Sequence, residues 1–172
     1  LIRNLTSGEM VGQILVAQRD TGEKISNIVI MGSGEPLDNY DNVIKFIKII
    51  NDETGLNIGL RCVTLSTCGL VEEIDKLAEE RMPITLSVSL HEADADTRKK
   101  LMPVAKRYKI KEIIQSCERY AYKTGRRVTF EYALIDDVND RVEDAYRLAG
   151  LLKGLSCHVN LIPVNPVENC EF

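Results

Sequence analysis

Short apolar runs alternate with helical stripes along almost the whole chain. Each apolar run has the length of a buried strand. Between the runs, apolar residues recur every three or four positions, which is the spacing of one face of a helix. The pattern therefore predicts strands that alternate with helices. The five predicted strands span residues 28–31, 63–66, 84–90, 128–135 and 158–163.

The predicted helices have recognisable ends. Thr6 and Glu9 match a capping box, in which the two side chains satisfy free amides at a helix start, so the chain begins with a helix. Gly125 and Gly154 end two later helices. The apolar stripes consist of Val43, Phe46, Ile47 and Ile50; Ile74, Leu77 and Ala78; Ile110, Ile113, Ile114, Cys117 and Ala121; and Val142, Ala145, Tyr146, Ala149 and Leu152.

Alternating strands and helices imply parallel pairing through right-handed crossovers, so the predicted fold class is α/β. A doubly wound sheet and a barrel both satisfy this pattern. Side-chain parity separates them, because Leu86 and Val88 share one face of their strand while Ser87 and Ser89 share the other. The second, fourth and fifth predicted strands show the same parity. Val63 and Leu65 lie opposite Thr64 and Ser66 in the second strand, and Val128, Phe130 and Tyr132 lie opposite Thr129 and Glu131 in the fourth. In the fifth strand, Val159 and Leu161 lie opposite His158 and Asn160.

Apolar faces on every strand suit a covering layer of helices, and the polar faces must then converge on one another. An open parallel β/α barrel that holds a polar ligand accommodates such an interior, whereas a closed barrel packed with aliphatic side chains does not. The alternative is a sheet with one solvated face, which helices between all strands disfavour. We therefore predict a partial, open barrel.

Length, composition and charge narrow the picture. A chain of 172 residues with 44% hydrophobic residues fits one domain, residues 1–172. It has no membrane-spanning run and no secretory signal, so we expect a cytoplasmic protein without a membrane partner. Five scattered cysteines form neither a metal-ligand set nor a disulfide framework. The net charge of -4 argues against holding nucleic acid by long-range attraction, so any RNA contact must be local or come from other parts of a longer protein.

Polar residues at the carboxyl ends of the first two predicted strands are candidates for ligand binding. Gly34 lets the backbone approach a ligand, and Glu35 offers a carboxylate to an ammonium group. A glycine turn in which Glu35 caps the next helix is the alternative. Ser66 either presents its hydroxyl inward or caps the helix that begins near Val71.

Later strand ends carry further candidates. Ser89 and His91 place a hydroxyl and an imidazole on one face, suited to a ribose or a carboxylate, although a satisfied structural histidine is the alternative. Asn165 precedes a proline and offers an amide to an adenine edge or a sugar, or else forms a simple turn. Glu131 lies within its strand, so we predict pairing with an interior group such as His158 in preference to acid/base catalysis.

Several longer strings occur in an order that resembles a known family. They are Arg-Asn-Leu-Thr (3–6), Met-Gly-Ser-Gly-Glu-Pro (31–36), Asn-Tyr-Asp-Asn (39–42), Ser-Leu-His (89–91), Leu-Met-Pro (101–103), Gly-Arg-Arg-Val-Thr-Phe-Glu-Tyr (125–132) and Asn-Leu-Ile-Pro-Val-Asn-Pro (160–166). Together they resemble the radical S-adenosylmethionine (SAM) RNA methyltransferases of the RlmN and Cfr type. The resemblance covers essentially the whole chain.

The resemblance implies SAM and a four-iron, four-sulfur (4Fe–4S) cluster as cofactors, ribosomal RNA and transfer RNA as substrates, methylation of an adenine carbon, expected to be C2, and a cellular electron donor. In the family, a three-cysteine cluster loop lies just before the Arg-Asn-Leu-Thr segment, and a methyl-carrying cysteine lies beyond the position of residue 172. We therefore expect the middle of a radical SAM barrel without its first strand, with no catalytic or metal-binding residue, weak affinity for SAM and no activity alone. The implied SAM contacts are Gly34, Glu35, Ser66, Ser89, Leu90, His91 and Asn165.

Two other functions stay open on the sequence. One is a different radical SAM enzyme, such as an activating enzyme, which shares the barrel and the glycine-glutamate turn. The other is a cluster-free module that binds nucleotides or RNA. A chain that starts with a helix also leaves the barrel edge unpaired, so we expect self-association through that edge.

Overall fold

The computed structural model describes residues 2–164. Within that range no helix is both long enough and apolar enough to cross a lipid bilayer. Three short 3-10 turns, η1 (Pro36–Asn39), η2 (Leu60–Cys62) and η3 (Pro103–Lys106), lie between the main elements. The helices and strands are α1 (Ser7–Thr21), β1 (Ile28–Ile30), α2 (Tyr40–Asn51), β2 (Val63–Thr67), α3 (Val71–Glu79), β3 (Thr85–Ser89), α4 (Ala95–Leu101), α5 (Ile110–Thr124), β4 (Val128–Leu134), α6 (Val142–Leu151) and β5 (Cys157–Pro163).

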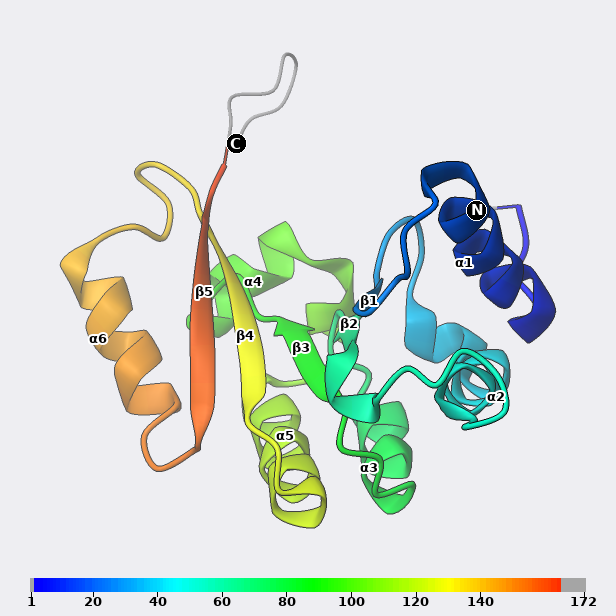
Figure 1. The fold of residues 1–172 in the computed structure, drawn as a ribbon. Helices are drawn as coiled ribbons and strands as arrows, with labels where there is room; N and C mark the ends of the chain where they lie inside the picture. Colours follow the sequence, from blue (N-terminus) through cyan, green and yellow to red (C-terminus); the bar gives the residue numbers. More distant parts are fainter. Residues whose placement is uncertain (1, 165–172) are drawn as a thin grey trace.

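The five strands form one parallel sheet in the order β1-β2-β3-β4-β5. Because each strand lies beside its predecessor, the strand order never reverses, unlike in a doubly wound sheet. Figure 1 shows α2, α3, α5 and α6 along the outer side of the curved sheet. This arrangement is an arc of a β/α barrel, so the predicted fold class is confirmed.

The predicted parity of side chains is confirmed in the three central strands. Leu65, Leu86, Val88 and Phe130 are fully buried on the side that faces the helices. The polar residues of the other face lie beside one another across the sheet, because the strands pair in register. Those pairs are Thr64 with Thr85, Ser66 with Ser87, Ser87 with Thr129, and Ser89 with Glu131.

Two of the predicted helix ends are confirmed, whereas α6 ends at Leu151 with Leu152 as its cap, before Gly154. The amide of Glu9 donates to the Thr6 hydroxyl at 3.3 Å, and the amide of Thr6 donates to the Glu9 carboxylate at 2.8 Å, which completes the capping box. Gly125 takes the left-handed conformation, with φ of 65°, and ends α5. The sequence pattern missed α4, because a seven-residue helix rich in charge carries too few apolar positions to show a stripe.

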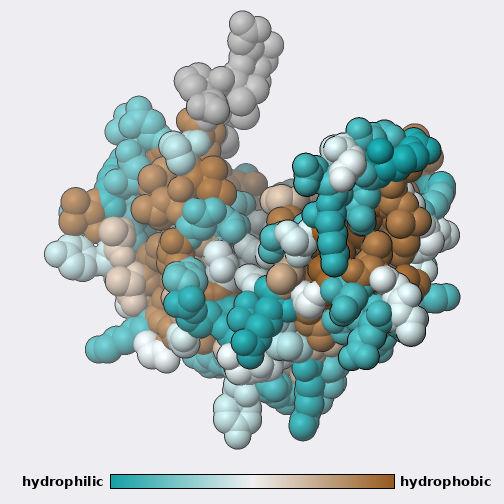
Figure 2. All heavy atoms as spheres, viewed as in Figure 1, coloured by the Kyte–Doolittle hydropathy of each residue, from teal (hydrophilic) through white to brown (hydrophobic). Residues whose placement is uncertain are grey.

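One expectation about the outer face is wrong for β5. Val159 and Leu161 were predicted to lie under the helix layer, yet 38% and 55% of their surface is exposed. The exposure in β5 arises because it is an edge strand in residues 2–164, with β4 as its one neighbour. Tyr146, predicted in the apolar stripe of α6, is 76% exposed, because the buried face of α6 carries Asp144 and Leu148 instead. Figure 2 shows hydrophobic side chains gathered over this part of the surface.

The alternation within β4 gives a direct test of the fold. Phe130→Ala should lower the free energy of unfolding by about 3–5 kcal/mol, because a fully buried ring leaves a cavity. Thr129→Ala, one position along on the polar face, should cost less than about 1 kcal/mol. Urea unfolding followed by circular dichroism measures both values. Equal losses in the two variants would contradict the observed orientation of the strand.

Candidate functional site

Two hollows share the turn that follows β1. The inner hollow, of about 210 Å³, lies over the carboxyl ends of β1, β2 and β3. The edge hollow, of about 300 Å³, lies between the same turn and the start of the chain. The inner hollow is lined by Met31, Gly32, Gly34, Glu35, Pro36, Ser66, Thr67, Cys68 and Ser89.

Glycine shapes the shared turn. Gly32 and Gly34 have φ angles of 132° and 112°, a region that other residues rarely adopt. A Cβ atom added to Gly32 would meet no atom within 4 Å, so the conformation and not the available space requires glycine there. The turn consequently presents bare main chain to both hollows.

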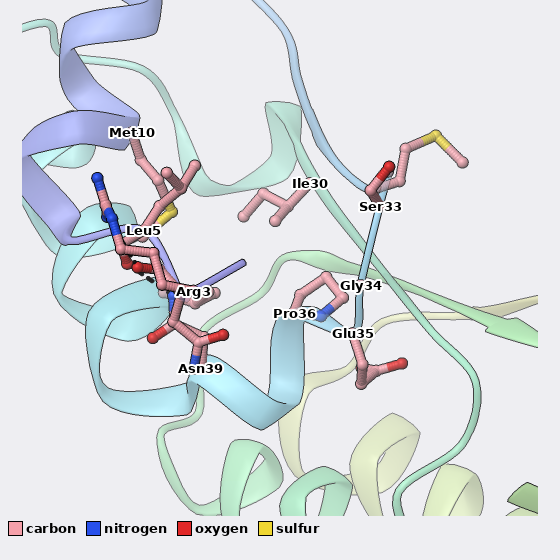
Figure 3. Close-up of a pocket in the computed structure, with 13 residues that line it drawn as sticks. Arg3, Leu5, Met10, Ile30, Ser33, Gly34, Glu35, Pro36 and Asn39 are labelled. Atoms are coloured by element: carbon pink, nitrogen blue, oxygen red, sulfur yellow. Dashed lines mark hydrogen bonds between the residues drawn. The ribbon is translucent and has the colours of Figure 1, made fainter. Parts of the chain in front are cut away.

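Glu35 joins this turn to the end of β2. One carboxylate oxygen accepts the amide of Leu37 at 3.0 Å and so caps η1. The other accepts the amide of Cys68 at 2.7 Å. Capping, the alternative considered from the sequence, is therefore present, and the same carboxylate also fixes a second wall of the inner hollow. Figure 3 shows the Glu35 side chain pointing away from Arg3 and Asn39, which border the edge hollow.

Ser66 and Ser89 line the inner hollow from neighbouring strands. Ser66 does not cap α3, because the residue at that helix start, Leu70, has no side-chain cap bond. Within residues 2–164 the hydroxyls of Ser66 and Ser89 form no hydrogen bond, in contrast to Ser87, which donates to Glu131 at 2.7 Å. Both hydroxyls are thus available to a ligand.

Two other predicted residues, Leu90 and His91, do not line the inner hollow. The Leu90 side chain is fully buried in the core. His91, with φ of 58°, accepts the amide of Ala133 on Nδ1 at 3.1 Å and thereby links the ends of β3 and β4. Burial, reinforced by the positive charge of Arg98, lowers the pKa of His91 below its ordinary value, while Glu131 opposes the shift. His91 therefore has the structural role considered as the alternative. Asn165 lies outside the described residues.

A fully buried arginine that the sequence pattern did not reveal holds these strand ends together. Arg98 donates from Nε to the carbonyl of Leu90 at 2.9 Å. Its Nη2 lies 3.3 Å from the carbonyl of Ser89 and 3.4 Å from that of Cys68. Arginine is usually a surface residue, so neither its spacing nor its neighbours signalled this position.

Asn139 is a second buried polar residue that sequence reasoning missed. Its amide group donates to the carbonyls of His91 and Ala133, both at 2.8 Å, and its oxygen accepts the amide of Ile135 at 2.8 Å. These bonds hold the loop after β4 against the end of β3. A lone asparagine in a polar loop gives no sequence signal that separates this role from an ordinary turn.

Glu131 pairs with interior groups, as predicted, but its partners differ from the expected one. Its carboxylate accepts the Ser87 hydroxyl at 2.7 Å and the amide of Asn160 at 2.6 Å. His158 was the wrong choice, because the register places Asn160, two residues further along β5, directly beside Glu131. The three side chains link β3, β4 and β5 across the polar face.

The four cysteines of residues 2–164 do not form a metal site. The described residues contain no group of three or more histidine, cysteine or acidic side chains placed to hold a metal ion. Burial, together with the neighbouring Glu35 carboxylate, raises the pKa of the Cys68 thiol to about 12, so the thiol stays protonated at neutral pH. A protonated thiol is a weak nucleophile. Because no three of them lie together with other ligands, the cysteines of residues 2–164 do not fit a 4Fe–4S cluster.

Comparison with known proteins agrees with this geometry. The family model described as Radical SAM superfamily matches residues 9–149. Proteins described as probable dual-specificity RNA methyltransferase RlmN are 61% identical over 99% of the chain in Clostridium acetobutylicum and 63% identical over 98% in Alkaliphilus oremlandii. The chain covers 50% and 49% of those two proteins, so it spans about half the length of the curated relatives it matches.

Solved structures give the same picture. A crystal structure of a radical SAM methyltransferase from Sphaerobacter thermophilus matches 99% of the chain with a TM-score of 0.93 and 50% identity, and the match covers 51% of that protein. SuiB from Streptococcus suis shares the fold, with a TM-score of 0.68 at 17% identity over 98% of the chain and 36% of SuiB.

The strand order and the hollow over the strand ends define an α/β protein built as an arc of a barrel, with a hollow at the carboxyl edge of the sheet, where α/β barrels hold their ligands. The chain belongs to the Radical SAM superfamily. Membership implies SAM and a 4Fe–4S cluster as cofactors, and residues 2–164 supply polar groups suited to SAM but no ligand set for the cluster.

The environment of His91 predicts a specific pH dependence of stability. The pKa of His91 is lower in the folded protein than in the unfolded chain, so the unfolded chain binds a proton on this residue first as the pH falls. The stability that neutral His91 contributes is therefore complete above about pH 6.5 and is lost as the pH falls below that value. His91→Asn keeps an acceptor and tolerates the positive φ, so the variant should lack this acid-sensitive part. Urea unfolding between about pH 5 and pH 8 measures the difference between the two proteins. Parallel curves for wild type and variant would show that His91 is not held neutral.

Proposed function

We propose that the protein containing this chain transfers a methyl group from SAM to an adenine carbon, C2, of ribosomal RNA and transfer RNA in the cytoplasm, drawing on a cellular electron donor. The relatives described as dual-specificity RNA methyltransferases support this proposal, because they match nearly the whole chain at about 60% identity. The chain corresponds to about half of each relative and has no cluster ligands in residues 2–164. We therefore propose that it is the central part of the barrel and is inactive alone.

We further propose that SAM binds in the inner hollow. The observation that carries this proposal is the pair of serine hydroxyls, Ser66 and Ser89, that face the same hollow as the bare main chain of Gly34. Glu35 adds a carboxylate that retains lone pairs for an ammonium group after binding two amides. Leu90, His91 and Asn165 complete the proposed set of SAM-binding residues.

SAM, when bound, supplies the transferable methyl group and the source of the radical. The chain's own residues have simpler tasks. The serine hydroxyls hydrogen-bond the polar edges of the cofactor, the glycine turn lets it approach the main chain, and Glu35 keeps the turn and the end of β2 at a fixed separation.

Equilibrium dialysis of the chain with labelled SAM tests the proposed site. The double variant Ser66→Ala and Ser89→Ala should bind SAM about tenfold more weakly, because two hydrogen bonds of about 0.5–1.5 kcal/mol each are lost. Ser156→Ala, an exposed serine just before β5, is the matched control and should leave the affinity unchanged. Unchanged affinity in the double variant would place SAM elsewhere.

We also propose that the chain self-associates through its free sheet edges. Within residues 2–164, β1 and β5 each pair with a single strand, and Leu161 on β5 is 55% exposed. A long apolar edge strand favours pairing with another chain.

Sedimentation velocity over a range of protein concentrations tests this association. Wild type should sediment faster as its concentration rises, whereas Leu161→Lys should remain monomeric because a charge on an edge strand opposes pairing. Ser156→Lys adds the same charge outside the strand and should behave as wild type. A wild-type protein that stays monomeric at every concentration would rule out the proposal.

A further inference from the structure

One segment of the chain is rich in positively charged residues, although the net charge of the chain is negative. Residues 99–111 contain six lysines and arginines and no aspartate or glutamate, whereas the whole chain has 22 basic and 26 acidic residues. We call this set the basic rim. It consists of Lys99, Lys100, Lys106, Arg107, Lys109 and Lys111, all of them exposed.

The topology places the basic rim at the same end of the sheet as the inner hollow. The rim follows β3, whose carboxyl end carries Ser89, and it continues through α4 and η3 to the start of α5. Because α5 returns the chain to the beginning of β4, its first turn lies at the carboxyl edge of the parallel sheet. Figure 1 shows α4 near the upper end of β3, and Arg98 on α4 donates to the carbonyls of Ser89 and Leu90 there. A large ligand that reached the hollow would therefore pass close to the rim.

Most of the rim's charge is not neutralised by neighbouring carboxylates. Lys99 pairs with Asp96 at 2.9 Å, and Arg107 lies 3.8 Å from Glu72. Within residues 2–164 the other four side chains form no salt bridge. Four exposed ammonium groups, those of Lys100, Lys106, Lys109 and Lys111, are thus available to an anionic partner.

From this placement we propose that the basic rim binds the phosphate backbone of RNA and orients the substrate over the inner hollow. The proposal rests on the proposed function, because that function requires an RNA substrate at the hollow. A chain with a net charge of -4 gains little from long-range attraction, so any RNA contact made by this chain itself requires a local basic cluster, and the rim supplies one. Lysine contacts with phosphates position a nucleic acid without reading its sequence, so the rim determines orientation and leaves base selection to other groups.

Fluorescence anisotropy with a labelled single-stranded oligoribonucleotide tests the rim on this chain. Wild type should bind RNA with an affinity that falls steeply between about 50 and 200 mM salt, with a log–log slope near -3 for four phosphate contacts. The rim variant carries Lys100→Glu, Lys106→Glu, Lys109→Glu and Lys111→Glu. It should bind at least about tenfold more weakly at the lower salt concentration, with a slope near zero.

A control variant changes the net charge equally at other places. Lys24→Glu, Lys45→Glu, Arg127→Glu and Lys153→Glu alter exposed residues on α2 or near the amino ends of strands. This variant should keep most of the RNA affinity. Equal losses in the two variants, no RNA binding by wild type, or equally tight binding of polyglutamate, which would indicate an acidic protein partner, would each overturn the proposal.

SAM dialysis on the same proteins separates this inference from the proposed function. The rim variant should bind SAM as wild type does, because none of its substitutions lines the inner hollow. If the chain binds RNA through the basic rim but does not bind SAM, the proposed function is wrong and the proposed RNA-binding role of the rim is kept. If the rim variant retains its RNA affinity while SAM binds as proposed, only the RNA-binding role of the rim is wrong.

Discussion

Arg98 lies fully buried where β2 and β3 end, and it donates to main-chain carbonyls from both strand ends. Its Nη1 atom is buried without a partner in residues 2–164. Burial lowers the pKa of the guanidinium, which nevertheless stays protonated in proteins. Loss of Arg98 would leave these carbonyls without hydrogen-bond donors, and each unsatisfied buried polar group lowers the free energy of unfolding by about 1–3 kcal/mol. Arg98 therefore holds together the two strand ends that form much of the hollow.

The network that starts at Arg98 extends around the hollow through main-chain groups. Cys68 offers its carbonyl to Arg98 and its amide to Glu35, while Glu35 also caps the turn after β1. Three walls from separate parts of the sequence are therefore connected by hydrogen bonds to the backbone. Because backbone groups carry these bonds, Ser66 and Ser89 keep their hydroxyls for a ligand. The walls are organised before any ligand arrives, which reduces the entropy lost on binding.

The sequence predicted the parts of the fold that depend on periodicity. Parity in β3 identified both the buried and the polar face, since side chains alternate strictly along a strand. The predicted burial was wrong at the outer face of β5, because exposure there depends on which element lies beside the strand and not on the alternation within the strand. At the site, Gly34, Glu35, Ser66 and Ser89 follow from their positions at strand ends. Arg98 and Asn139 do not, since their roles arise from long-range contacts with main-chain carbonyls that no local pattern encodes.

The strand order has a mechanical consequence. A closed barrel fixes its own radius, because the ring of hydrogen bonds admits a single combination of strand number and stagger. Within residues 2–164 the arc has an open edge at β1 and another at β5 and so lacks such a ring, and its curvature is set by local twist. A partner that paired with either edge would change that curvature and, with it, the spacing between the strand ends that surround the hollow. Edge pairing and the affinity for a ligand in the hollow would then be thermodynamically linked, and each would alter the other by the same factor.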